Sequence, residues 1–248
     1  MKYIPTPELQ HFTSACLSGT RLGEFIVNGF IEAYSCKPDR TEAKLYHTVR
    51  TKVERQISSS PKVFTEKMAS SPLGPINHSS TIQLLVQLIS TLNSSLPEHD
   101  FSNLQASDFV HCANLDLVVN EINEYLLNYS LEAKHQGSRK KFWSILDGVI
   151  NLKKSQVFSF VPDDESEVFG KGKLWTMNYF FVNKSAKKIV FFACSAQRKL
   201  QPYSMFDTTD VTPIFEECDE EMFDMEMDIS DNVGTRTYVD LTQRTWVS

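Results

Sequence analysis

The stretch from Leu174 to Cys194 reads LWTMNYFFVNKSAKKIVFFAC, and its pattern predicts two β-strands joined by a polar turn. The connection, Asn183 to Lys188, is too short and too polar to form another element. Aromatic residues are concentrated on both sides of it, and they favour a pleated, half-buried surface over a helix. One face of the first strand would carry four large side chains: Trp175, Met177, Tyr179 and Phe181. Its other face would carry a mixed set: Leu174, Thr176, Asn178, Phe180 and Val182.

The second strand indicates where this hairpin lies within a sheet. Ile189 to Ala193 is apolar without alternation, as expected for a strand that is buried on both faces. We therefore place the hairpin near the middle of a sheet. Because one face of the first strand is mixed, we expect one face of the sheet to be fully covered and the other only partly covered.

Periodicity along the rest of the chain predicts a single globular α+β domain over residues 1–205, in which helices pack on an antiparallel sheet. A strand or hairpin is expected at Glu24–Cys36, where Gly29 marks a bulge or a close approach. Asp39 and Glu42 predict a capping box that opens a helix with an apolar stripe. The other expected elements are a helix from Ser79 (capped by Ser79 or Ser80) to before Pro97, helices at Leu115–Leu127 and Ser138–Ile150 (capped by Ser138), and a strand at Gln156–Val161.

Residues 58–75, SSSPKVFTEKMASSPLGP, interrupt the helical pattern and predict a mobile linker inside the domain. Arg55 stands three residues before Ser58, and two serines precede prolines, at Ser60-Pro61 and Ser71-Pro72. A kinase needs an accessible segment, and a phosphate would add about −1.5 to −2 charge there. Short patterns of this kind also arise by chance. The candidate phosphorylation sites are Ser58, Ser59, Ser60, Ser70 and Ser71.

The net charge of −6 is distributed unevenly along the chain. Residues 1–205 carry 23 basic and 19 acidic side chains, whereas residues 206–248 carry 2 and 12. The first part is mildly basic. The second is an acidic tail whose like charges favour disorder, although it could also dock on a basic surface. The basic run Arg139-Lys140-Lys141 is either solvated charge, a localisation signal or a contact for an acidic partner.

The sequence does not indicate an enzyme. Its six histidines are scattered without metal-ligand spacing, its five cysteines form no C-x-x-C pair, and no phosphate-binding loop or G-x-S-x-G motif is present. We expect no cofactor, no metal site and no membrane span, and a reduced, intracellular protein. The enzymatic alternative is an unrecognised site near His99 or His111.

Direct nucleic-acid binding is disfavoured too, because the whole chain is acidic and only one turn combines lysines with aromatic residues. By elimination, the residues favour a regulatory or interaction protein. The side chains that a partner could contact are those of the hairpin turn and of an acidic loop: Lys184, Lys187, Lys188, Asp163 and Asp164.

Three blocks of the sequence point to a known family, and the third of them is long and unusual in composition. The first is GFIEAYSCK at residues 29–37, followed by KLY at 44–46, and the second runs from PLGPI at 72–76 to PEHDFS at 97–102. The third combines LW, NYFF, NK and KKIVFF between residues 174 and 192. Over residues 24–195 the chain thereby resembles the eukaryotic Maf-type repressors of RNA polymerase III transcription. Leu73, Leu96 and Val182 replace residues that are usually aromatic in that family, which we interpret as exchanges in packing.

This resemblance implies a non-enzymatic repressor that binds RNA polymerase III near its clamp and blocks its recruitment to promoter-bound transcription factor IIIB. It also implies control by kinases and phosphatases downstream of TOR, nutrient and stress signalling. The phosphorylated protein would then be inactive and often cytoplasmic, and the dephosphorylated protein nuclear. The linker is short for the family, which leaves the number of phosphosites open. A generic phospho-regulated adaptor of another nuclear complex is the alternative.

Overall fold

The computed structural model describes residues 1–199 except 38, 60–70, 132–136, 163–167 and 171. The predicted acidic tail and its boundary at residue 205 lie outside the described residues. The helices are α1 (Pro7–Phe12), α2 (Arg40–Ser59), α4 (Ser79–Ser95), α5 (Leu115–Leu131) and α6 (Ser138–Ile150), with short helical turns η1 (Thr13–Leu17), η2 (Ala106–Asp108) and η3 (Leu152–Lys154). The strands are β1 (Lys2–Ile4), β2 (Thr20–Leu22), β3 (Phe25–Ser35), β4 (Phe109–His111), β5 (Gln156–Phe160), β6 (Trp175–Asn183) and β7 (Lys188–Arg198).

Within the described residues, seven strands form one antiparallel sheet in the order β1-β3-β7-β6-β5-β4, and β2 pairs with β3. The predicted hairpin is confirmed as β6–β7, and it lies in the middle of the sheet. Strand β7 pairs along its full length with β3, from Lys188 opposite Ser35 to Arg198 opposite Phe25. The predicted α+β class, with helices packed on an antiparallel sheet, is confirmed as well.

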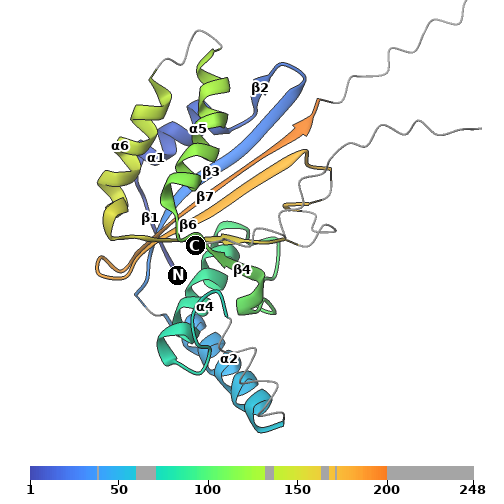
Figure 1. The fold of residues 1–248 in the computed structure, drawn as a ribbon, viewed down its shortest axis with the longest axis vertical. Coiled ribbons are helices and arrows are strands. Elements are labelled where there is room, and N and C mark those ends of the chain that lie inside the picture. The colour runs from blue at the N-terminus through green and yellow to red at the C-terminus, as the bar shows by residue number, and fades with distance from the viewer. Residues whose placement is uncertain (38, 60–70, 132–136, 163–167, 171, 200–248) are drawn as a thin grey trace, which may run out of the picture. The chain divides into compact units, whose positions relative to one another are not determined.

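Helices cover both faces of this sheet (Figure 1). Side chains from α1, α5 and α6 pack with Tyr179, Phe181 and Phe192 on one face. Side chains from α2 and α4 pack with Phe180 and Phe191 on the other. Each hairpin strand therefore contributes to two hydrophobic cores, one on each face of the sheet.

The face that was expected to be only partly covered is buried at Asn178, Phe180 and Val182, but it is open at its beginning, where Leu174 is 49% exposed and Thr176 is half-buried. Asn178 is 5% exposed, and its Oδ1 accepts a hydrogen bond from the Phe160 amide at 2.7 Å. The Thr176 hydroxyl donates to the Phe169 carbonyl at 2.7 Å. A buried polar group is tolerated when it has such a partner, so a polar residue such as Asn178 can lie in the buried part of a mixed face.

The capping box before α2 is confirmed. The Glu42 amide donates to Asp39 Oδ1 at 2.9 Å, and the Asp39 amide donates to Glu42 Oε2 at 3.2 Å. The hydrogen bond from the Glu42 amide lowers the pKa of Asp39. Helix α2 continues to Ser59, so the predicted start of the linker at residue 58 is wrong. Near the other end of the predicted linker, the Gly74 amide donates to the Ser71 carbonyl in a turn. Residues 60–70 lie outside the described part of the chain.

The three later helices are confirmed, with corrections at their ends. Helix α4 is buried on most sides, as predicted, but His78 rather than a serine occupies its N-cap position. At α6 the N-cap position belongs to Gly137, whose φ of 90° favours glycine, while Ser138 is buried in the first turn. Helix α5 extends to Leu131, beyond the predicted end. Strands β1, β2 and β4 have three residues each, too few to show a period, and were not individually predicted.

Gly29 allows β3 to approach β7 closely, which confirms one of the two predicted roles. The pairing is continuous through Gly29 and Cys194, without a bulge. A Cβ atom added at Gly29 would lie 2.5 Å from the Ala193 carbonyl oxygen, closer than real contacts allow. The central strands would therefore have to separate if residue 29 carried a side chain.

The first prediction concerns this contact. The Gly29→Ala variant should lose about 1–3 kcal/mol of unfolding free energy, because the added methyl group forces the backbone of β7 to move. Gly148→Ala is the matched control, since Gly148 lies at an exposed position of α6 and an added Cβ would meet open space. That variant should gain up to about 1 kcal/mol from helix propensity. Urea unfolding measures both, and equal stability of the two variants would contradict the close approach.

Candidate partner-binding surface

The turn between β6 and β7 is organised by one buried side chain, Asn183. Its Nδ2 donates to the Ile150 carbonyl, at the end of α6, at 2.7 Å. Its Oδ1 accepts hydrogen bonds from the Ala186 amide at 2.9 Å and from the Ser185 hydroxyl at 2.7 Å. Asn183 thus shapes the turn and fastens it to the C-terminal end of α6.

The three turn lysines that the sequence singled out differ in their surroundings. Lys184 and Lys187 are exposed, and Lys187 adopts a left-handed φ of 51°. Lys188 is half-buried, and its Nζ lies 3.5 Å from the Val149 carbonyl oxygen, longer than an ordinary hydrogen bond. Lys184 and Lys187 are therefore the more available to a partner.

The fold brings further lysines to this end of the sheet. Lys2 in β1 and Lys188 in β7 both pair with Ser35, so they lie about 10 Å apart on one face of the sheet. Lys153 and Lys154 lie in η3, which follows α6 and contacts β6. We call this set the hairpin-end lysines: Lys2, Lys153, Lys154, Lys184, Lys187 and Lys188.

The hairpin-end lysines gather positive charge at this end of the sheet. Among the described residues none of them takes part in an ion pair. Figure 1 shows the β6–β7 turn near the C-terminal end of α6 and the start of the chain. Sequence reasoning missed Lys2, Lys153 and Lys154, because strand pairing brings Lys2 to the turn and the packing of η3 against β6 brings Lys153 and Lys154. The one local signal was the adjacent pair Lys153-Lys154 directly after a predicted helix.

The basic run Arg139-Lys140-Lys141 does not join this surface. All three side chains are exposed in the first turn of α6, as predicted. The hairpin turn is fastened to the opposite end of that helix at Ile150, about 15 Å away along the helix axis. The two basic sets can therefore be altered independently.

Of the predicted phosphorylation sites, Ser58 belongs to α2, and Ser71 lies in the segment that leads to α4. Ser58 is exposed in the last turn of α2, where its hydroxyl donates to the Glu54 carbonyl at 2.9 Å. The Ser71 hydroxyl is buried and has no hydrogen-bond partner among the described residues. Ser60, Ser70, Asp163 and Asp164 lie outside the described residues, as does the side chain of Ser59.

No reactive centre emerges in the part of the chain that the structure describes. Burial raises the pKa of Cys36 to about 12 and that of Cys112 to about 11, the opposite of what a nucleophilic thiol needs. His111 packs against Phe158, with ring centroids 5.0 Å apart. Within the described residues no group of three or more His, Cys, Asp or Glu side chains could hold a metal ion. None of the described helices is long and apolar enough to cross a membrane.

The second prediction concerns Asn183. Its replacement by alanine would leave the buried Ile150 carbonyl without its partner, at about 1–3 kcal/mol, and would remove the hydrogen bond to the amide of the exposed Ala186, at about 1 kcal/mol. We expect Asn183→Ala to lower the unfolding free energy by about 2–4 kcal/mol in a urea titration. Ser185→Ala removes one hydrogen bond at an exposed position and should cost less than about 1 kcal/mol. Equal losses would mean that the turn is held in another way.

Residues 27–193 match the sequence model of the family described as Maf1 regulator. The repressor of RNA polymerase III transcription maf1 from Schizosaccharomyces pombe is 30% identical over 208 residues, covering 80% of this chain and 86% of that protein. The repressor of RNA polymerase III transcription from Dictyostelium discoideum is 28% identical, covering 89% and 94%. The crystal structure of citrus MAF1 superposes with a TM-score of 0.60 at 24% identity, covering 79% of this chain and all of that one. The chain therefore belongs to the Maf1 regulator family.

Proposed function

We propose that this protein represses transcription by RNA polymerase III. The observation that carries the proposal is the extent of the family match. Relatives that are named repressors of this polymerase align over most of their own length and most of this chain. The mechanism that we propose is binding to the polymerase, which prevents its recruitment to promoter-bound transcription factor IIIB. Such repression needs a surface that excludes another protein, and it needs no catalytic group.

We assign the initial attraction to the hairpin-end lysines. Six like charges without ion pairs among the described residues create a local positive potential, although the whole chain has a net charge of −6. Such a surface accelerates association with an acidic partner and loses its effect as salt screens it. Because the turn is fixed to α6 through Asn183, these charges are presented on a defined backbone. A defined arrangement favours binding of one partner over non-specific adhesion.

The third prediction tests this surface in transcription of a tRNA gene by purified factors. The unphosphorylated protein should suppress the product. The variant Lys153→Glu/Lys184→Glu/Lys187→Glu should require about tenfold more protein for equal suppression, because three attractive charges become repulsive. The variant Arg139→Glu/Lys140→Glu/Lys141→Glu changes the net charge by the same amount at the other end of α6. It should suppress transcription like the unaltered protein.

Each part of the proposal can be contradicted by a separate result. Equal weakening of both triple variants would indicate a response to net charge and not to the hairpin-end lysines. Undiminished transcription with folded, unphosphorylated protein would rule out repression of this polymerase. Affinity purification from cell extract addresses the adaptor alternative. Polymerase III subunits should dominate the bound fraction, whereas dominance of another nuclear complex would favour an adaptor.

We further propose that phosphorylation of the linker serines, by kinases that respond to nutrients and stress, holds the protein inactive in the cytoplasm. Each phosphate would add about −1.5 to −2 charge and could alter partner binding by local repulsion. At Ser58 a kinase would have to unwind the last turn of α2, because kinases bind extended segments. A phosphate there would also lie near the negative end of the helix dipole, which favours unwinding. Phosphatases would reverse the change and allow return to the nucleus.

The fourth prediction concerns this control. Replacing Ser58, Ser59, Ser60, Ser70 and Ser71 by alanine should increase the nuclear fraction in fed cells, as measured by fluorescence microscopy. The exposed serines Ser80, Ser102 and Ser144 provide a control triple-alanine variant that should leave the distribution unchanged. If the five-serine variant also distributes like the unaltered protein, the controlling sites lie elsewhere in the chain.

A further inference from the structure

The end of the hairpin opposite the turn opens into a pocket of about 530 Å³. It lies between helix α5 and strands β3, β6 and β7, with Leu22 of β2 at its margin. The lining residues are Leu22, Phe25, Val27, Glu121, Glu124, Tyr125, Trp175, Thr176, Met177 and Ala196. Trp175 and Asn183 mark the two ends of β6, so the pocket is about 27 Å from the hairpin-end lysines.

Aromatic rings form much of the wall, and two of them are unusually exposed. Trp175 is 36% exposed and Phe25 is 40% exposed, although both rings are large and apolar. The Trp175 and Tyr125 rings lie 5.6 Å apart between centroids, at an angle of 59°. The Tyr125 hydroxyl donates to the Cys16 carbonyl at 3.0 Å, which fixes that ring in place. Trp175 pairs across the strands with Ala196, whose small side chain leaves space in the pocket for a bound group.

Two carboxylates supply the charge of the pocket. Glu121 and Glu124 are three residues apart on α5, and Tyr125 is four residues from Glu121, so all three share one face of the helix. Glu121 Oε2 accepts a hydrogen bond from the Tyr179 hydroxyl at 2.6 Å, which holds this carboxylate in place. Arg198, two residues beyond Ala196, is exposed and is not part of the lining. The charged lining groups are therefore both negative.

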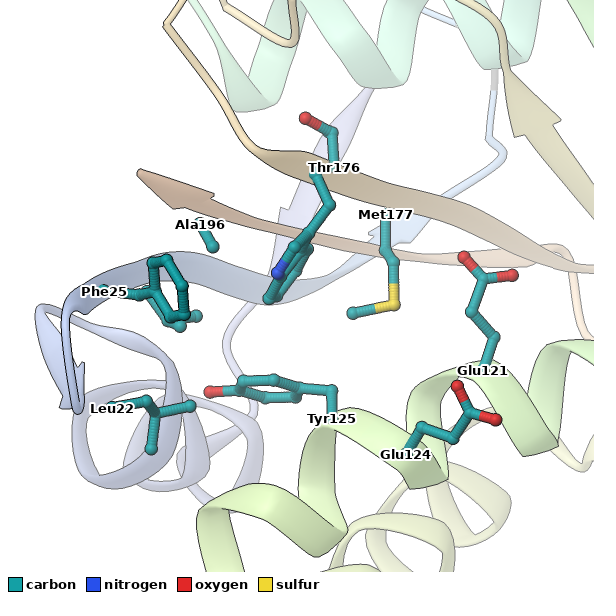
Figure 2. A pocket seen from close by; sticks show the side chains of 10 residues that line it. Leu22, Phe25, Glu121, Glu124, Tyr125, Thr176, Met177 and Ala196 are labelled. Carbon is teal, nitrogen blue, oxygen red and sulfur yellow. The ribbon is translucent and has the colours of Figure 1, made fainter. Parts of the chain in front are cut away.

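The arrangement separates an apolar part from an acidic part. Figure 2 shows Leu22 and Phe25 on one side of the pocket and Glu121 and Glu124 on the other, with Tyr125 facing Met177 between them. A cation is attracted both by the faces of aromatic rings and by carboxylates. Arginine suits such a site better than lysine, because its planar guanidinium stacks on rings, pairs with carboxylates through two hydrogen bonds and is less strongly hydrated.

We propose that this pocket binds an arginine side chain of a partner protein, together with an adjacent apolar residue. The guanidinium lies between the Trp175 and Tyr125 rings and the two glutamates. The apolar neighbour covers Leu22 and Phe25, because one arginine does not fill a space of about 530 Å³. The proposal is independent of the polymerase function, since it concerns the other end of the sheet and a different chemistry. The protein would thereby present a basic surface and an arginine-binding pocket at opposite ends of one hairpin.

The fifth prediction uses peptide titration followed by NMR on the full-length, ¹⁵N-labelled protein. The probe is acetyl-Leu-Arg-amide, and the comparison probe replaces arginine by citrulline, which has nearly the same shape but no charge. The Trp175 indole signal should shift saturably with arginine, with a dissociation constant on the order of millimolar for so small a ligand. Citrulline should bind about fivefold more weakly, because the cation–π and carboxylate interactions are lost.

Variants assign the effect to the pocket. Glu124→Gln should weaken binding of the arginine probe about threefold while leaving the remaining amide spectrum unchanged, because this side chain is exposed and the change preserves its shape. Trp175→Leu should abolish saturable binding, as followed through the α5 amide signals. Glu98→Gln is the matched control, an exposed glutamate in the turn after α4, and should bind like the unaltered protein.

Several results would overturn the proposal. Equal affinity for the citrulline and arginine probes would mean that the pocket recognises apolar surface only. Tighter binding of acetyl-Leu-Lys-amide would exclude the assignment to arginine. If Glu98→Gln weakened binding of the arginine probe as much as Glu124→Gln, the attraction would be generally electrostatic. If the Trp175 signal did not shift, or shifted without saturation, the pocket would bind no such side chain. None of these outcomes bears on repression of the polymerase, because the measurement contains no transcription component.

Discussion

The structure depends on burying both faces of the β6–β7 hairpin. Phe180 and Phe191 stack across the two strands with centroids 4.4 Å apart, and both side chains are fully buried. On the reverse side, Phe181 and Phe192 are buried just as completely. Strands that are apolar on both faces cannot leave either face in water, so the chain must supply helices to each side. This requirement explains why α1, α5 and α6 cover one face of the sheet, whereas α2 and α4 cover the other.

The same burial dictates how the few polar groups of the central sheet are used. Asn178 bonds to the backbone of the last residue of β5, Thr176 bonds to the backbone of the segment between β5 and β6, and Asn183 bonds to the end of α6. Each bond satisfies a group whose isolation would be costly and also fixes the position of a neighbouring segment. The polar residues therefore specify how the connections are attached, while the aromatic residues supply the stabilising contact area.

Sequence patterns predicted the elements whose own residues determine their burial. The apolar helices belong to this group, because a stripe with helical spacing is visible within each of them. The hairpin and β3 belong to it through their aromatic and β-branched content, and the capping box of α2 through the spacing of Asp39 and Glu42. Burial of the mixed face of β6 could not be predicted, because the partners of Asn178 and Thr176 come from elsewhere in the chain. The three-residue strands could not be predicted either, because they form by pairing with neighbouring strands and are too short to show a period. For the candidate surface, the turn lysines were found, but Lys2 reaches them only through its pairing with Ser35.

The pocket eluded sequence reasoning for a further physical reason. Trp175 and Tyr125 are residue types that are common in protein cores. Nothing in the neighbouring sequence distinguishes an aromatic side chain that is buried from one that lines a cavity. What distinguishes Trp175 is its position at the end of β6, where the small residue Ala196 lies opposite and the covering helix contributes glutamates. The middle of the hairpin must be apolar on both faces, whereas its two ends emerge from between the helices. On the hairpin itself, charged side chains and exposed rings are found at those ends, and this is where the two proposed recognition surfaces lie.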